Sequence, residues 1–134
     1  MQNIFESSLT MSSQSRIPIN NEKFKQSILT ALADVNMVNI MNSAVINPKS
    51  INEIIRETDI SHTTAYRKVK WMVENGLLVV EKIVVSRDGK KFSLLKSVFK
   101  SIDAKYEYDR VTVEIEQNVD VLHKVAQRIF SLDS

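Results

Sequence analysis

The sequence contains no cysteine, which excludes a disulfide framework, a thiolate metal site and a cysteine nucleophile. Its only glycines are Gly76 and Gly89, so there is no glycine-rich loop to cradle a phosphate group. The two histidines, His62 and His123, are too few and too far apart in sequence for a metal site, and no Ser/His/Asp arrangement indicates nucleophilic catalysis. We therefore expect a protein that is not an enzyme and that uses no metal and no cofactor.

Long apolar runs are also missing. None approaches the roughly 20 residues that span a bilayer, and the first residues lack the basic and apolar regions of a signal peptide. We expect no membrane association and a cytoplasmic location. The 134 residues are 43% hydrophobic and 25% charged, which is typical of a single folded domain with a core of its own.

Positive charge is concentrated in the middle of the sequence. Residues 61–97 hold 8 Lys and Arg against 3 Asp and Glu, whereas residues 1–60 hold 5 against 6 and residues 98–134 hold 5 against 7. Because positive potential drives association with phosphate groups, we expect any polyanion to bind the middle segment.

The first part of the sequence predicts an arm followed by two helices. Residues 1–20 are rich in Ser, Asn and Gln, and they predict a flexible arm that is either mobile or docked on a partner. Apolar residues recur at helical spacing over 22–32 and 35–45, and Asp34 is placed to cap the second of these helices. The two helices predict a scaffold rather than a site.

Two further helices are predicted on either side of a tight turn. Ser50 and Glu53 form a capping box that begins the first of them. It ends near Asp59, a residue type that tolerates the left-handed conformation of a turn. The second runs over 61–75, from a capping serine to the stop at Gly76, and it turns an apolar stripe toward the core.

The rest of the sequence predicts two β-hairpins and a last helix. The apolar runs 77–85 and 92–98 flank the turn signal at Gly89. Alternating residues from 101 onward predict a second hairpin with its turn at Tyr108-Asp109. Asn118 can cap a final helix that is apolar on more than one side and therefore needs a second partner surface.

A helix, a tight turn, a second helix and a basic hairpin follow one another in the order of a winged helix-turn-helix reader of DNA. Arg67 can donate two hydrogen bonds to guanine, and His62 and Thr63 begin the helix that enters the major groove. The residues of helix 61–75 predicted to contact DNA are Ser61, His62, Thr63, Thr64, Tyr66, Arg67, Lys68 and Lys70. The wing, residues 86–91, would contact the backbone or the minor groove through Arg87, Lys90 and Lys91.

The same residues allow other interpretations. Winged helices also serve as protein-interaction modules, so the polar helix face could belong to a component of the transcription machinery that docks on protein without specific DNA readout. A basic hairpin tip can simply keep a strand edge soluble. Trp71 is more typical of a core flank than of a base-stacking platform. Tyr106, Tyr108 and Phe130 could line a small-molecule pocket, although such aromatic residues more often belong to a core or a dimer seam.

The stretch 28–99 resembles the winged helix-turn-helix regulators of the ArsR-like class, particularly the small archaeal ones. ILTALADVNMVNIM is similar to the opening helices of that family, and SINEIIRETDISHTTAYRKVKWMVENGLL is similar to its helix-turn-helix core. Ile55 departs from the family pattern, as does Asp59 in place of a turn glycine, and the cysteines of metal-sensing members are absent. The residues that match are Glu53, Ser61, Thr64, Tyr66, Arg67, Lys68, Val69, Gly76 and Leu77.

The expected fold is α+β, mainly α, with a flexible arm over 1–20, a winged helix-turn-helix domain over 21–99 and a dimerisation segment over 100–134. The expected function is sequence-specific binding of double-stranded DNA by a homodimer that regulates transcription, with a small-molecule or protein effector left open. Two recognition helices would then lie about one DNA turn apart on a pseudo-palindromic operator. The resemblance further implies that the last helix pairs the subunits, through Val119, Leu122, Val125, Ala126, Ile129 and Phe130.

Overall fold

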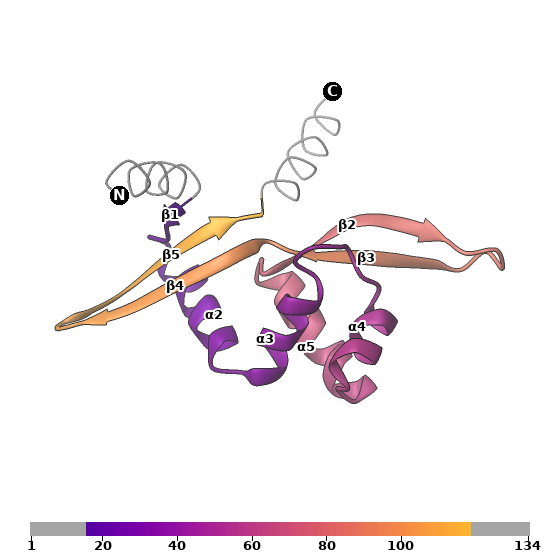
Figure 1. The fold of residues 1–134 in the computed structure, drawn as a ribbon, viewed down its shortest axis with the longest axis horizontal. Coiled ribbons are helices and arrows are strands. Elements are labelled where there is room, and N and C mark those ends of the chain that lie inside the picture. Colours follow the sequence, from indigo (N-terminus) through magenta and orange to yellow (C-terminus); the bar gives the residue numbers. More distant parts are fainter. Residues whose placement is uncertain (1–15, 119–134) are drawn as a thin grey trace, which may run out of the picture.

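The computed structural model describes residues 16–118, in which four helices lie on one side of a ribbon of antiparallel strands (Figure 1). The architecture is mixed α+β, and helices and strands take similar shares of the described residues, so the expected predominance of helix is not seen there. The elements are β1 Arg16–Pro18, α2 Glu22–Leu32, α3 Val35–Ser43, α4 Ile51–Thr58, α5 His62–Glu74, β2 Leu78–Val85, β3 Lys91–Ser97, β4 Phe99–Glu107 and β5 Arg110–Gln117.

The four helices predicted within residues 16–118 are confirmed, and each begins at a side chain that accepts a backbone hydrogen bond. Asp34 accepts from the N–H of Met37 at 3.1 Å and caps α3. The capping box of α4 is complete: Glu53 N–H donates to Ser50 Oγ at 3.2 Å, and Ser50 N–H donates to the Glu53 carboxylate at 3.1 Å. The last predicted residues of the second helix are wrong, since α3 ends at Ser43.

Left-handed residues end α4 and α5 where the sequence predicted. Asp59 has a φ of 57° and turns the chain from α4 toward α5. Gly76, which follows the C-cap residue Asn75 of α5, has a φ of 80°, and the next N–H, of Leu77, donates to the carbonyl of Met72 at 2.8 Å. Both turns use residue types that reach this conformation at low cost.

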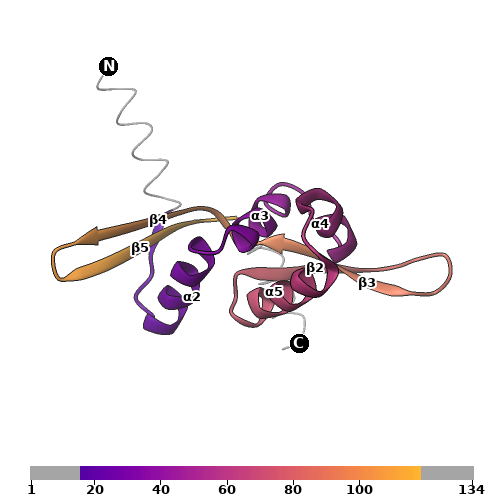
Figure 2. The ribbon, with the colours of Figure 1, turned by 90° about the horizontal axis from the view of Figure 1, so that it is seen from below.

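The strands form two antiparallel sheets that meet end to end along one continuous ribbon, β3 followed by β4 (Figure 1). β2 pairs with β3, while β5 pairs with β4 and also with β1. Val98 joins the two sheets, because its N–H donates to Leu77 and its carbonyl accepts from Asn118. Figure 2 shows the β2–β3 and β4–β5 hairpins extending from opposite ends of the molecule.

The end of the expected arm belongs to the folded protein. Arg16–Pro18 forms strand β1, in which Ile17 lies opposite Ile115 of β5. Ile17 and Ile19 are half-buried and pack against the core, since alternate residues of a strand share a face. The prediction of a flexible arm is therefore wrong for these residues, and residues 1–15 lie outside the described part.

One hydrophobic core extends across the predicted boundary at residue 100. Ile28, Ile54 and Met72 of the helices are fully buried in the same cluster as Val113 and Ile115 of β5. Residues 100–118 therefore share the core of the helices, as expected for a single folded domain. None of the helices within residues 16–118 is long and apolar enough to cross a membrane.

Candidate functional site

The outward face of α5 carries most of the predicted contact residues. Ala65, Val69 and Met72 are buried, which fixes the rotation of the helix and confirms its predicted inner face. The opposite side therefore faces solvent: Tyr66 is 51% exposed, and Arg67 is exposed as well. This face offers a guanidinium group and a phenol without any rearrangement of the core.

The amino-terminal end of α5 is also open to solvent. Ser61 caps it by accepting from Thr64 N–H at 3.4 Å, and His62 and Thr63 of the first turn are exposed. Free backbone N–H groups and the positive end of the helix dipole favour an anion at such a terminus. Thr64 is half-buried, so it contributes less to this surface than its neighbours.

Lys68 points away from the other predicted residues. Its ammonium group donates to the Asp34 carboxylate at the start of α3, and only 12% of its side chain is exposed. This hydrogen bond lowers the pKa of the Asp34 carboxyl below its ordinary value, while burial opposes the shift. The structure thus places Lys68 as a link between α5 and α3, in disagreement with its predicted phosphate contact.

The tip of the β2–β3 hairpin presents Arg87, Lys90 and Lys91 to solvent. Its turn is closed by hydrogen bonds from Ser86 N–H to Lys90 at 2.8 Å and from Gly89 N–H to Ser86 at 2.9 Å. The Ser86 hydroxyl donates to Asp88 and lowers the pKa of that carboxyl. The tip is therefore an ordered turn that carries three cations.

A groove of about 910 Å³ lies between α4, α5 and the β2–β3 hairpin. It brings Tyr66 of the α5 face together with cations from three elements, and its floor is apolar. The cations are Arg56 of α4, Lys70 of α5, and Lys90 and Lys91 of the hairpin; the apolar residues are Ile51, Val69, Val73, Val80, Phe92 and Leu95.

Two acidic residues also line the groove, and both have partners. Glu53 is held by the capping box of α4, and Glu74 lies 4.0 Å from the ammonium group of Lys70. The side chain of Lys70 is nevertheless 80% exposed, so it remains accessible to an anion. Cations outnumber carboxylates in the groove, and its net charge is positive.

Sequence reasoning missed Arg56 and the apolar floor of the groove. The charge of Arg56 and its place near the end of a helix were visible in the sequence. The approach of α4 to the β2–β3 hairpin was not visible in the sequence, because it depends on the packing of α4 against α5 and β3.

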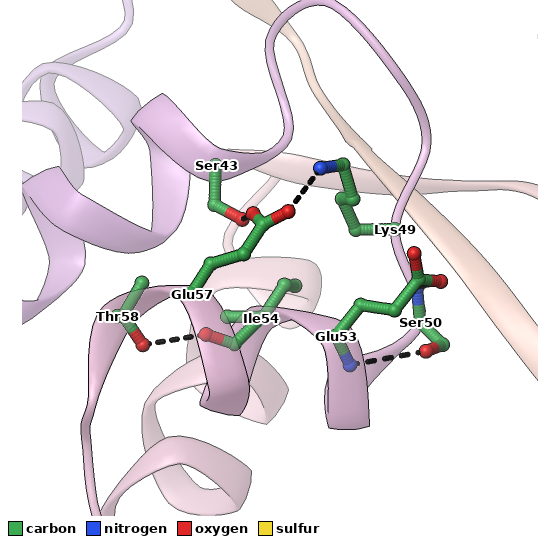
Figure 3. Close-up of polar contacts among 7 residues, drawn as sticks. All are labelled: Ser43, Lys49, Ser50, Glu53, Ile54, Glu57 and Thr58. Atoms are coloured by element: carbon green, nitrogen blue, oxygen red, sulfur yellow. Dashed lines mark hydrogen bonds and ion pairs between the residues drawn. The ribbon is translucent and has the colours of Figure 1, made fainter.

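Polar contacts hold α4, one wall of the groove, against the end of α3 (Figure 3). The Glu57 carboxylate accepts hydrogen bonds from the Lys49 ammonium group and the Ser43 hydroxyl, and both lower the pKa of Glu57. Lys49 also bridges to Leu95 of β3 through two backbone hydrogen bonds, of 2.8 and 2.7 Å. The segment before α4 therefore links α3, α4 and the hairpin.

The remaining predicted site residues lie elsewhere. Tyr106 and Tyr108 are 78% and 93% exposed. The alternative of a small-molecule pocket stays a prediction, because it also needs Phe130, which lies outside the described residues. Trp71 is half-buried against the core, as predicted. The expected dimerisation helix, with Phe130, lies outside the described residues.

Comparisons with protein-family models, with curated proteins and with solved structures found no match to this chain.

Proposed function

We propose that this protein is a winged helix-turn-helix regulator of transcription, akin to the ArsR-like class, that binds double-stranded DNA as a homodimer. One observation carries the proposal: the exposed face of α5 and the basic tip of the β2–β3 hairpin border the same positively charged groove. In this proposal α5 is the recognition helix, the hairpin is the wing, and the protein is a binding protein rather than an enzyme.

The side chains of this surface suit the chemistry of duplex DNA. A helix fits the major groove, where Arg67 can donate two hydrogen bonds to a guanine, while Tyr66 can contact a thymine methyl group or a phosphate. The sugar-phosphate strand that borders the major groove would lie in the protein groove, between α5 and the β2–β3 hairpin. There Lys70, Lys90 and Lys91 would neutralise phosphates, whereas Arg87 would reach the backbone or the minor groove.

Two measurements test the proposal. Titration of a generic duplex at two salt concentrations should show binding that weakens as salt rises, because the cations release counterions from DNA. Selection of bound sequences from a random duplex pool should enrich paired half-sites related by a two-fold axis. Lack of any salt-dependent binding would contradict the proposal at its first step.

The apolar floor of the groove favours one alternative function, docking on a protein of the transcription machinery. Ile83 and Val85 of β2 add exposed apolar surface, at 63% and 59% exposure, opposite the groove residues Ser93 and Lys91 of β3. A protein partner would bury this surface, whereas a phosphate backbone would leave much of it uncovered. The salt titration separates the two functions, because a protein-docking module has no need to bind generic duplex.

A further inference from the structure

The outer edge of strand β4 is open. Within the described residues β4 pairs only with β5, so a strand of nine residues has one unpaired edge. The other side of this sheet is protected, because β1 pairs with β5 and Lys25 donates its ammonium group to the Val111 carbonyl at 3.1 Å. An open edge of this length is a template for pairing with another strand.

We propose that β4 pairs with the β4 of a second copy of this chain, antiparallel, with Ala104 opposite Ala104 of the second copy. The joined sheet has the order β1-β5-β4-β4-β5-β1. This inference deepens the proposed function and rests on its homodimer, since it names the surface that holds the two copies together; it does not depend on DNA binding.

Charge favours this register over the two adjacent ones. Residues 101, 103, 105 and 107 share one face of β4, and the Ala104 register places Asp103 opposite Lys105 of the second copy, twice by symmetry. If Asp103 instead lay opposite Asp103 of the second copy, two aspartates would face each other. If Lys105 lay opposite Lys105 of the second copy, two lysines would face each other. Opposite charges across a strand pair stabilise it and like charges destabilise it.

Asp103 and Lys105 each have an ion-pair partner within their own chain, and both ion pairs can be exchanged for pairs with the second copy. Asp103 lies 3.2 Å from Arg16, and Lys105 lies 2.9 Å from Glu107. The side chains of Asp103 and Lys105 are 61% and 66% exposed, and such surface ion pairs contribute little to stability. Arg16 also keeps Glu114 within 3.9 Å as a second partner.

An apolar notch beside the start of β4 also favours the register with Ala104 opposite Ala104 of the second copy. A cavity of about 160 Å³ lies between the α2–α3 corner and the start of β4, with Leu32, Val38 and Ile102 in its lining. Tyr106 shares the face of Ile102 and is 78% exposed. The Ala104 register places Tyr106 of the second copy opposite Ile102, at this notch. Burial of the ring there removes apolar surface from water on both copies.

Antiparallel pairing of identical strands places a two-fold axis perpendicular to the joined sheet. The helix α2 of each copy then covers the same face of that sheet, because the axis exchanges the copies without exchanging the faces. A two-fold axis is also the symmetry that a pseudo-palindromic operator requires.

Exchanging the charges of Asp103 and Lys105 tests the pairing of β4 with β4 of the second copy. The measurements use the full chain and contain no DNA. Sedimentation equilibrium should show a dimer for the wild type. Asp103→Lys and Lys105→Asp should each raise the dissociation constant by at least about tenfold, and the double variant should restore it, because the opposite charges again face each other. Tyr106→Ala should weaken the dimer without changing the far-UV circular dichroism. Lys82→Glu, a charge reversal at an exposed position of the distant β2–β3 hairpin, is the control and should leave the dimer intact.

Three outcomes would overturn the inference: a monomeric wild type, single variants that dimerise as the wild type does, or a double variant that stays as weak as the single ones. The second outcome would move the interface to another surface, such as the predicted last helix. If the charge exchange behaves as expected and generic duplex does not bind, the proposed DNA function fails and the β4 pairing stands.

Discussion

Lys68 and Lys70 are two positions apart on α5 and have different surroundings. Two residues along a helix turn by about 200°, so the two side chains leave the helix on nearly opposite sides. Lys70 is 80% exposed in the groove, whereas Lys68 is 12% exposed against Asp34. Only Lys70 is therefore positioned to meet a phosphate, and Lys68 links two helices.

Arg67→Ala should weaken binding to a selected operator by about 1–3 kcal/mol, and it should have less effect on generic duplex, because the loss is of base contacts. Fluorescence anisotropy with both duplexes measures the difference. Arg67→Lys is the matched control: it keeps the charge but loses the two parallel hydrogen bonds, so operator affinity should still fall. Equal losses on both duplexes would show that Arg67 contacts only the backbone.

Asp34→Asn should lower stability at neutral pH by at most about 1 kcal/mol, because it removes the ion pair with Lys68 and keeps an amide that can cap α3. The pKa of Asp34 is lowered in the folded state, so its contribution is present above the ordinary value of 3.8. It is lost as the pH falls through the lowered pKa. Urea denaturation from pH 7 to pH 3 should show the wild type and the variant converging in acid; a constant difference would contradict this.

At the scale of single elements, α4 depends on contacts at both of its ends. The capping box holds its first turn, and Thr58 donates to the Ile54 carbonyl at 2.6 Å near its last. Glu57 joins α4 to Ser43 and Lys49 (Figure 3). Arg56 lies between the capping box and Glu57 on α4, so these contacts hold the turns on both sides of it. Ser50 and Glu53 line the groove themselves.

Ser50→Ala should destabilise the protein by about 1 kcal/mol, because a backbone N–H at the start of α4 loses its acceptor. Urea denaturation measures the change. Ser50→Thr keeps the hydroxyl and should lie close to the wild type. If Thr destabilises as much as Ala, the effect comes from packing at this buried position rather than from the cap.

Lys90→Ala at the hairpin tip should weaken binding to every duplex and reduce the slope of affinity against salt by about one, as expected for the loss of one phosphate contact. Affinities at four salt concentrations give the slope. Lys23→Ala on α2 removes an exposed charge from another part of the molecule and should leave the slope unchanged. Equal effects of the two variants would indicate a diffuse response to net charge.

At the scale of the whole molecule, the helices and the β4–β5 hairpin share one core. Val113 and Ile115 are 2% and 3% exposed, and they belong to the same cluster as Met72 of α5. Asn118 adds a polar link, because its side-chain amide donates to the carbonyls of Val45 and Ser97 at 2.9 and 3.2 Å. A protein with one core should unfold in one step.

Ile115→Val should lower the free energy of unfolding by about 1 kcal/mol through the loss of one buried methyl group. The transition should stay single, and Trp71 fluorescence on α5 should coincide with far-UV circular dichroism. Exposed Ile83→Val on the β2–β3 hairpin is the control and should change little. Separate transitions for the two probes would mean that the β4–β5 region folds as its own unit.

Local signals made much of the fold predictable. Ser50 with Glu53, and Gly76 after α5, act on their immediate neighbours, so element boundaries could be taken from a few residues of sequence. The predictions that were wrong concern segments that are far apart in the sequence and meet in the fold. Strand β1 exists because Ile17 meets Ile115 of β5, and no local signal carries that pairing.

The candidate site also has a part that the sequence predicted and a part that only the structure showed. The inner and outer faces of α5 follow from apolar spacing alone, and the exposure of Tyr66 and Arg67 agrees with it. The same spacing turns Lys68 toward the inner face, three residues after Ala65 and four before Met72. Its partner Asp34 is far away in sequence at the start of α3, so only the structure showed the ion pair.

The sequence by itself determined the four helices within residues 16–118, the caps of three of them, the two hairpin turns and the concentration of positive charge in residues 61–97, because each is a property of neighbouring residues. Only the tertiary structure decided that α4, α5 and the β2–β3 hairpin border one groove, that the β4–β5 hairpin shares the core of the helices, and that one edge of β4 is open within residues 16–118. These three features depend on which surfaces pack together, and packing is set by the whole set of buried contacts rather than by any short stretch of the chain.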